Sequence, residues 1–177
     1  MKYLLPAILA VFALAGLTGN SEARMRGAGM SPEAFARQAM AINEFEIQAG
    51  HLALEKAQNE QIKQFAQRMI DDHTRINDEM KARLKQANIP EPTQLLDPKH
   101  EALLNKLKSE QGTTFERTYV AINRQGHKEA VRLLETYARR GTNPVLKQIA
   151  ANVLPTIKEH LKLAEALPSG RALTARK

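Results

Sequence analysis

The stretch that decides the fold is "NEQIKQFAQRMIDDHTRINDEMKARLKQA", residues 59–87. Its apolar side chains recur every three or four residues, at Ile62, Phe65, Ala66, Met69, Ile70, Ile76, Met80 and Leu84. This spacing predicts an amphipathic α-helix, and Asn59 can cap its first turn. The apolar face also carries His73, four residues after Met69 and three before Ile76. An ionisable ring on such a face raises the question of what the ring does there.

A second helix is predicted immediately before this one. Ser31 is its expected N-cap, Pro32 occupies the first helical position, and the apolar pattern continues to about residue 58. The connection to the helix at 59–87 is short, so the two helices are expected to form an antiparallel hairpin.

Another pair of helices is predicted in the second half of the chain. The first should open on a capping box formed by Thr113 and Glu116 and should end at Gly141 as its C′ residue. The second begins with Asn143 as N-cap and ends before Pro168. These two helices are also expected to form a hairpin.

The two hairpins are joined by a long crossover, residues 88–112, which is interrupted by three prolines and carries a short helix at about 98–110. No strand-like alternation competes with the helical pattern. The sequence therefore predicts an all-α, ferritin-like antiparallel four-helix bundle over residues 31–168, with a long crossover that carries a short helix.

The first residues have the form of a secretory signal peptide. Lys2 precedes an apolar run that is short for a membrane span, and a small-x-small site follows it. We expect cleavage after Ala23, which assigns 1–23 to the signal peptide and 24–30 to a flexible tail. The mature protein is then expected to be periplasmic or secreted, with no transmembrane segment after cleavage.

Composition excludes several kinds of site. The chain has no cysteine, which excludes disulfides, thiolate metal sites, cysteine nucleophiles and lipoprotein attachment. Its formal net charge is +7, but five basic residues lie in the tails 24–30 and 169–177, so the expected bundle is close to neutral. This distribution argues against a nucleic-acid partner, although the basic tails could contact anionic surfaces.

Each long helix carries one polar group on its apolar face, and together they are Glu46, His73, His127 and His160. In each hairpin the two groups lie at similar distances from the turn, within about one helical turn of each other at ~1.5 Å rise per residue. All four meet at mid-bundle when the hairpins are aligned. One carboxylate and three imidazoles suit a borderline divalent ion such as zinc, iron, copper or nickel.

Three functions are compatible with this set. The first is binding of one divalent metal by the four residues, for sensing, buffering or structure. The second is an envelope-stress or interaction module with a metal-free, hydrogen-bonded polar core. The third is a mononuclear metal redox enzyme with an open coordination position.

Four further residues could take part in the site or lie outside it. Met69 is a soft copper ligand or a packing residue, and Asp72 either supports a histidine of a neighbouring helix or is solvated. His51 and His100 lie off the common face and are predicted at the surface or its boundary.

Three segments resemble the bacterial family called domain of unknown function 4142, in the ferritin-like superfamily: "EFEIQAGHLALEKAQNEQIKQFAQRMIDDHTRINDEM", "GTTFERTYVAINRQGHKEAVRLLE" and "LKQIAANVLPTIKEHLKLAEAL". The resemblance covers nearly all of residues 33–167. It implies an exported four-helix bundle, places the family's histidines at His73, His127 and His160 and its glutamate at Glu46, and implies no particular reaction.

A di-iron centre is not expected within this bundle. Such a centre needs Glu-x-x-His on two helices. The residues three positions before the three histidines are Ile70, Arg124 and Ile157, and none of them can supply the carboxylate. No metalloprotease or nucleophile-elbow motif is present either.

Overall fold

The computed structural model describes residues 29–168, which contain five helices and no strand. The helices are α2 (Pro32–Lys56), α3 (Glu60–Gln86), α4 (Pro98–Ser109), α5 (Gly112–Arg140) and α6 (Pro144–Ala166). The all-α prediction is confirmed. The predicted signal peptide 1–23, nearly all of the tail 24–30 and the tail 169–177 lie outside the described residues. None of the helices described is long and apolar enough to cross a membrane.

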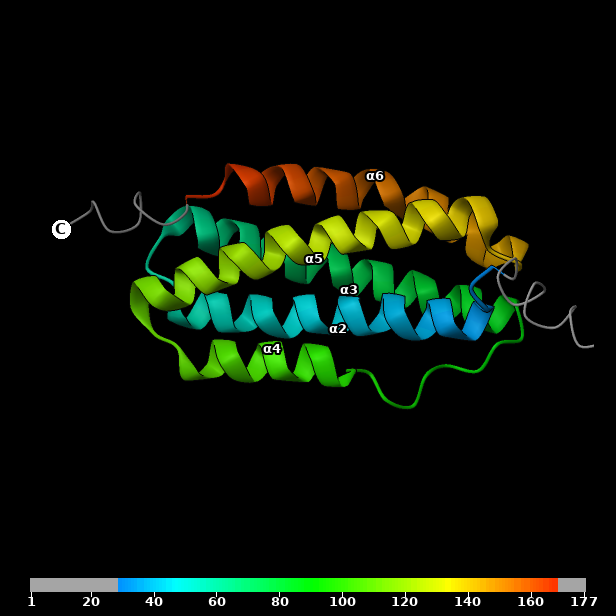
Figure 1. Cartoon of the computed structure of the whole chain (residues 1–177), viewed down its shortest axis with the longest axis horizontal. Helices are drawn as coiled ribbons and strands as arrows, with labels where there is room; N and C mark the ends of the chain where they lie inside the picture. The colour runs from blue at the N-terminus through cyan, green and yellow to red at the C-terminus, as the bar shows by residue number, and fades with distance from the viewer. Residues whose placement is uncertain (1–28, 169–177) are drawn as a thin grey trace, which may run out of the picture.

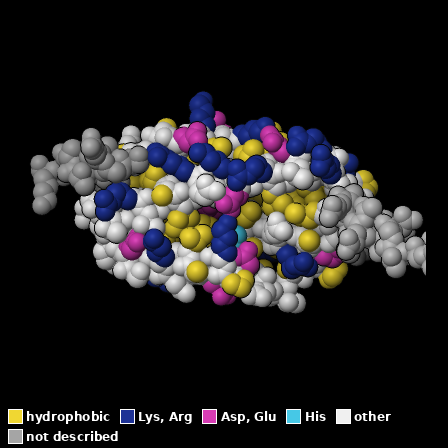
Figure 2. All heavy atoms as spheres, in the orientation of Figure 1, with side chains coloured by type: hydrophobic (Ala, Val, Ile, Leu, Met, Phe, Trp, Pro, Cys, Tyr) yellow, Lys and Arg dark blue, Asp and Glu magenta, His cyan; other side chains and the backbone are white. Residues whose placement is uncertain are grey.

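Four long helices lie side by side, and α4 lies outside them (Figure 1). The pairs α2–α3 and α5–α6 form the two hairpins, and α3 packs on α6 while α2 packs on α5. The crossover returns along the outside of the bundle and brings α4 against both α2 and α5. On the face in Figure 2, basic and acidic side chains are interspersed, with hydrophobic side chains between them.

Three of the predicted helix starts are confirmed by their capping hydrogen bonds. In each case a side-chain oxygen accepts from a backbone N–H in the first turn, at 2.9–3.2 Å: Ser31 from Ala34, Asn59 from Gln61, and Asn143 from Leu146. These bonds satisfy donors that the helix itself leaves unpaired.

The predicted capping box of α5 is wrong. The helix begins earlier, at Gly112, whose φ of +54° suits glycine, and its N-cap Gln111 makes no side-chain capping bond. Glu116 Oε1 instead accepts the backbone N–H groups of Gln58 and Asn59, both at 2.8 Å. Glu116 therefore supports the turn between α2 and α3, which the local sequence pattern could not reveal.

Gly141 does end α5, but not as a left-handed C′ residue. Its φ is −59°, and its N–H donates to Tyr137 O at 2.7 Å. A β-carbon at this position would lie 2.6 Å from both the carbonyl oxygen and a ring carbon of Tyr137. Space, rather than backbone conformation, requires the glycine.

Two long cationic side chains satisfy the ends of neighbouring helices. Lys56 Nζ, at the end of α2, donates to backbone carbonyls at the end of α4, including Leu107 O at 3.2 Å. Arg124 of α5 donates to Ala164 O at 2.9 Å and to Leu167 O at 2.7 Å at the end of α6. Arg124, which occupies a position where a di-iron motif requires glutamate, thus caps the C-terminal end of α6.

The apolar core is divided into two clusters, one toward each end of the bundle. One is built around Phe35, Leu84 and Leu146, and the other around Phe65, Leu107 and Phe115. Between them, residues 41–44, 70–75, 121–129 and 158–163 of the four long helices contribute no fully buried member to either cluster, and only the partly buried Ile42, Ile122 and Leu163 pack against one. The buried polar side chains of the bundle concentrate in this middle layer.

Candidate metal centre

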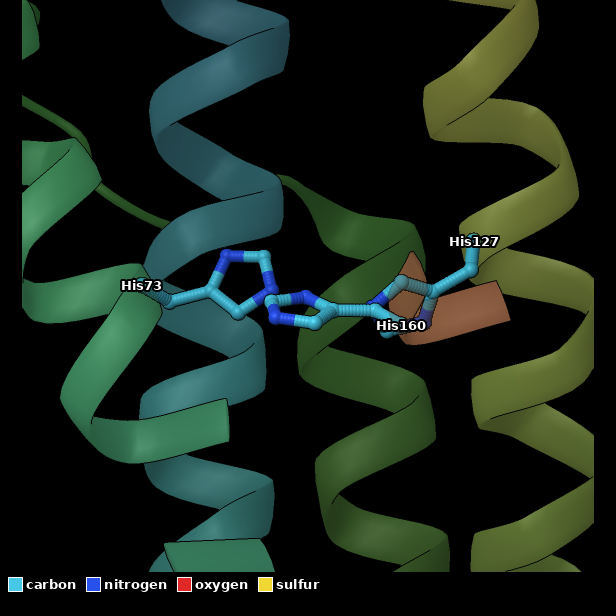
Figure 3. A group of neighbouring side chains, drawn as sticks. All are labelled: His73, His127 and His160. Atoms are coloured by element: carbon cyan, nitrogen blue, oxygen red, sulfur yellow. The ribbon is translucent and has the colours of Figure 1, made fainter. Parts of the chain in front are cut away.

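Three histidines from three helices meet in the middle layer. His73 comes from α3, His127 from α5 and His160 from α6, and each is at most 1% exposed. Their rings point toward one another (Figure 3), with centroids 5.3, 5.5 and 5.8 Å apart. One ring nitrogen from each histidine lies within 4.8 Å of the other two. The prediction that these three residues meet near mid-bundle is confirmed.

Each ring has one nitrogen bonded to an oxygen outside the cluster. The three bonds are all 2.9 Å long: His73 Nδ1 to Asn43 Oδ1, His127 Nδ1 to Asn123 O, and His160 Nε2 to Asp72 Oδ2. A carbonyl or carboxylate oxygen can only accept, so these ring nitrogens carry the protons. The hydrogen bonds therefore select the tautomer of each imidazole.

The second nitrogen of each ring is left with a free lone pair. His73 Nε2, His127 Nε2 and His160 Nδ1 are buried and have no hydrogen-bond partner in the described part of the chain. Buried polar atoms normally have a partner, so three unpaired acceptors side by side imply a missing donor or cation. Histidine that donates one N–H to a protein oxygen and keeps the other nitrogen free is the usual arrangement of a metal ligand.

Burial keeps the imidazoles neutral at ordinary pH. It lowers the pKa of His127 to about 4, helped by the charge of His160, and it also lowers the pKa of His160. The pKa of His73 falls well below its ordinary value because of burial and then the charges of the other two rings. Neutral rings are the form that binds a metal ion.

Glu46 lies beside this cluster but outside the group of three. Its carboxylate is buried, and Oε1 is 3.7 Å from His127 Nδ1, the nitrogen that is bonded to Asn123 O. Oε2 has no partner among the described residues, and burial raises the pKa of Glu46 to about 8. Direct ligation by Glu46 stays a prediction.

The amino-acid sequence matches the family Domain of unknown function (DUF4142) over residues 18–167. The chain belongs to the DUF4142 family. No curated protein matches this sequence.

Solved structures of similar fold come from the DUF305 group and from CopM. A DUF305 fragment from Deinococcus radiodurans has a TM-score of 0.66 at 17% identity, covering 77% of this DUF4142 chain and 95% of the fragment. A DUF305 protein from Streptomyces coelicolor, described as a candidate secreted protein, has a TM-score of 0.61 at 16% identity. The match covers 73% of this chain and 85% of that protein. CopM in its Cu(II)-bound form has a TM-score of 0.64 at 20% identity, and the match covers 77% of this chain and 95% of CopM.

Two supports of the DUF4142 cluster were missed in the sequence. Asn43 precedes Glu46 by three residues and so shares a helix face with a predicted site residue, which was an available signal. Asn123 supports His127 through its backbone carbonyl, which a residue of any type would supply, so no side-chain pattern could reveal it. Asp72, by contrast, contacts His160 of α6, which confirms its predicted support of a histidine on another helix.

The remaining candidates lie where the sequence placed them. His51 is exposed, and His100 is half-buried, with Nδ1 2.9 Å from Asp97 Oδ2. Met69 is fully buried in an apolar cluster, as expected for a packing residue. The DUF4142 site thus has three convergent nitrogen donors, a donor set that suits zinc, copper, iron and nickel.

Proposed function

We propose that this protein binds one divalent transition-metal ion through His73, His127 and His160. The observation that carries the proposal is that three buried rings, each with one unpaired nitrogen, place one nitrogen each within 4.8 Å of the other two. Three lone pairs in one buried site repel one another, and a cation removes that repulsion while satisfying all three acceptors. A metal-free polar core, in contrast, leaves the three nitrogens without donors.

Glu46 completes the charge of the proposed site. A divalent ion bound by three neutral rings places two positive charges in the core, and an uncompensated buried charge is costly. The Glu46 carboxylate is the nearest acidic group on the α2 side, beside His127. Burial raises the pKa of Glu46 to about 8, and a cation close by favours the ionised form. We propose that Glu46 releases its proton when the ion binds and acts as the counter-charge, either from beside His127 or as the direct fourth ligand predicted by the sequence.

The fold of the protein makes copper the first ion to test. CopM, a protein of similar fold, has been solved with Cu(II). The imidazole donors suit copper, and they also suit zinc and iron. We propose a ferritin-like bundle that works outside the cytoplasm, because of the predicted signal peptide and the candidate secreted DUF305 protein of similar fold.

Sensing or buffering of a metal ion is favoured over redox catalysis. Three protein ligands would leave a coordination position open, as catalytic metal sites require. The three histidines, however, are fully buried, and one nitrogen of each ring is held by an oxygen of Asn43, Asn123 or Asp72. A redox-inert ion in stoichiometric amount would exclude the enzyme alternative.

The test is calorimetric titration of metal-free protein with Cu(II), Zn(II) and, without oxygen, Fe(II). We expect one site in the wild type, loss of that site in His73→Leu, and no change in His51→Leu, an exposed and matched control. Equal losses in the two variants would indicate adventitious surface binding. Identical titrations of all three proteins would leave the metal-free interaction module as the better function.

A further inference from the structure

A groove of about 610 Å³ lies between α2, α4 and α5, and it is lined by Glu46, which lies beside His127 of the metal centre. Its walls combine apolar side chains such as Phe45 and Leu103 with charged ones such as Lys99 and Glu129, which pair across the groove from α4 to α5. The crossover creates this groove, because α4 covers the junction of α2 and α5 from outside.

The groove contains one deeply buried carboxylate, that of Glu46. Glu46 is 1% exposed, its Oε2 has no partner in the described chain, and its Oε1 lies 3.7 Å from His127 Nδ1. A single side chain therefore contacts both the groove and a histidine of the metal centre. An unpaired buried oxygen is the kind of group that a passing cation would bind.

Gly126 leaves the carboxylate open to the groove. It lies in the middle of α5, where glycine costs up to about 1 kcal/mol relative to alanine. Neither packing nor backbone conformation requires it: a β-carbon would meet only Glu46 Oε1, at an ordinary 3.6 Å, and positive φ among the described glycines occurs at Gly112 alone. A larger side chain at position 126 would stand between the groove and Glu46.

The opposite approach is less suited to a cation. On the α3 side a surface hollow reaches Asp72, which contacts His160. Two guanidinium groups hold that carboxylate, with Arg75 Nη2 at 3.2 Å and Arg68 Nε at 3.4 Å. Their positive charges oppose a divalent ion at short range, whereas no cationic side chain pairs with Glu46 among the described residues.

We propose that the divalent ion enters and leaves through the groove under α4, and that Glu46 is the last oxygen that it contacts before the imidazoles. This inference rests on the proposed metal binding. It assigns to Gly126 the role of keeping the passage open. A passage controls rates and leaves the equilibrium unchanged, so the test must separate association from affinity.

The first experiment measures the rates of Cu(II) binding and release by stopped flow against a chromophoric chelator. In Gly126→Leu we expect both rates to fall about ten-fold or more, with the dissociation constant unchanged within about two-fold. The matched control is Gln148→Leu, which adds the same side chain at an exposed position of α6 outside the groove. Circular dichroism and urea unfolding establish that both variants are folded.

A second experiment blocks the groove after folding. The chain has no cysteine, so Gln125→Cys introduces a unique thiol on the groove wall. We expect a bulky aromatic group, attached to this thiol as a disulfide, to slow Cu(II) exchange more than an attached methyl group does. Removal of the attached group with a reductant, followed by desalting, should restore the original rate. Gln148→Cys with the same two attached groups is the control.

The outcomes separate the two proposals. Saturable Cu(II) binding that needs His73, with exchange rates unaffected by Gly126→Leu and by the bulky attached group, overturns the passage and leaves the metal site standing. Slower exchange in Gln64→Trp, which narrows the hollow beside Asp72, would place the passage on the α3 side instead. If wild-type protein binds no Cu(II), Zn(II) or Fe(II), the proposed function fails and the passage with it.

Discussion

His160 Nε2 lies 2.9 Å from Asp72 Oδ2, and this bond joins the buried centre of the bundle to its surface. The His160 side chain is fully buried, while that of Asp72 is 23% exposed. Partial burial raises the pKa of Asp72, but hydrogen bonds from His160 and Arg75 outweigh this effect, and the pKa is lowered overall. Asp72 is therefore ionised at neutral pH and orients the His160 ring as a charged acceptor.

Replacing Asp72 by alanine should weaken metal binding without removing a ligand. Partners that orient ligating histidines are worth about 10- to 100-fold in affinity, and we expect a loss in that range for Asp72→Ala. Titration calorimetry measures it. Asp71→Ala is the matched control, because Asp71 is exposed and bonds only to Gln67 among the described contacts. An equal affinity in the two variants would contradict the orienting role.

Metal binding should stabilise the protein through the three histidines. An ion that binds only the folded state adds about 2.7 kcal/mol to the free energy of unfolding when its concentration is a hundred times Kd. We expect a chelator to lower the melting temperature of the metal-loaded wild type and to have no effect on His127→Leu. A chelator-induced shift of the same size in His127→Leu would indicate that the stabilising ion binds elsewhere.

The stability of the metal-free protein should have a maximum near pH 6.5. The pKa of His127 falls from 6.5 to about 4 on folding, so the folded state binds fewer protons in that range and stability rises with pH. The pKa of Glu46 rises from 4.5 to about 8, so the folded state keeps a proton that the unfolded state releases, and stability falls with rising pH. Below pH 6.5 the rise in stability that the three histidines cause is larger than the fall that Glu46 causes. Above pH 6.5 only the fall due to Glu46 remains.

Glu46→Gln isolates the upper half of that profile. The amide cannot titrate, so we expect the decline in the free energy of unfolding between about pH 6.5 and 8 to disappear. Urea unfolding at several pH values, with chelator present, gives the profile. Glu44→Gln, a half-buried neighbour on α2 whose carboxylate bonds to Gln48, is the control and should keep the decline.

Two glycines inside long helices should respond oppositely to alanine. At Gly50 a β-carbon would lie 2.7 Å from Ile70 Cγ1 and 3.1 Å from Ala66 O, so Gly50→Ala should force α2 and α3 apart and destabilise the protein by about 1–3 kcal/mol. At Gly126 the space is sufficient, and Gly126→Ala should stabilise by up to about 1 kcal/mol. Denaturant midpoints compare them, and a destabilised Gly126→Ala would show that packing requires that glycine.

Arg124 should contribute to stability and not to metal affinity. Its guanidinium donates to three carbonyls at the end of α6, including Leu167 O. Arg124→Met keeps much of the side-chain volume and removes the donors, for which we expect a loss of about 1–3 kcal/mol. Arg117→Met, which removes only a long contact to Thr114, should change stability by less than about 0.5 kcal/mol.

Much of the fold could be predicted because its signals are local. The caps Ser31, Asn59 and Asn143 and the apolar periodicity fix where helices begin and which face is buried. Glu116 was misassigned because the groups that it bonds lie almost sixty positions away, at Gln58 and Asn59. A capping pattern indicates which bonds are possible, and tertiary contacts decide which are made.

The histidines of the site were also predictable from local signals, whereas the contacts that their side chains make with other helices were not. One polar residue on each apolar face identifies His73, His127 and His160, because buried polar side chains must bond to one another or share a cation. The sequence does not fix the offset and rotation of one hairpin against the other. It therefore could not show that Glu46 lies beside His127 Nδ1, or that Asn43 bonds to His73.

The division of the three histidines between hairpins has a consequence for folding kinetics. His73 belongs to α2–α3, whereas His127 and His160 belong to α5–α6, so the cluster exists only after the hairpins have docked. If the hairpins dock after the rate-limiting step of folding, an ion bound there strengthens contacts that are absent from the transition state, and such contacts slow unfolding while leaving the folding rate almost unchanged. The ion would then set how long each folded molecule survives, with no part in how quickly it forms.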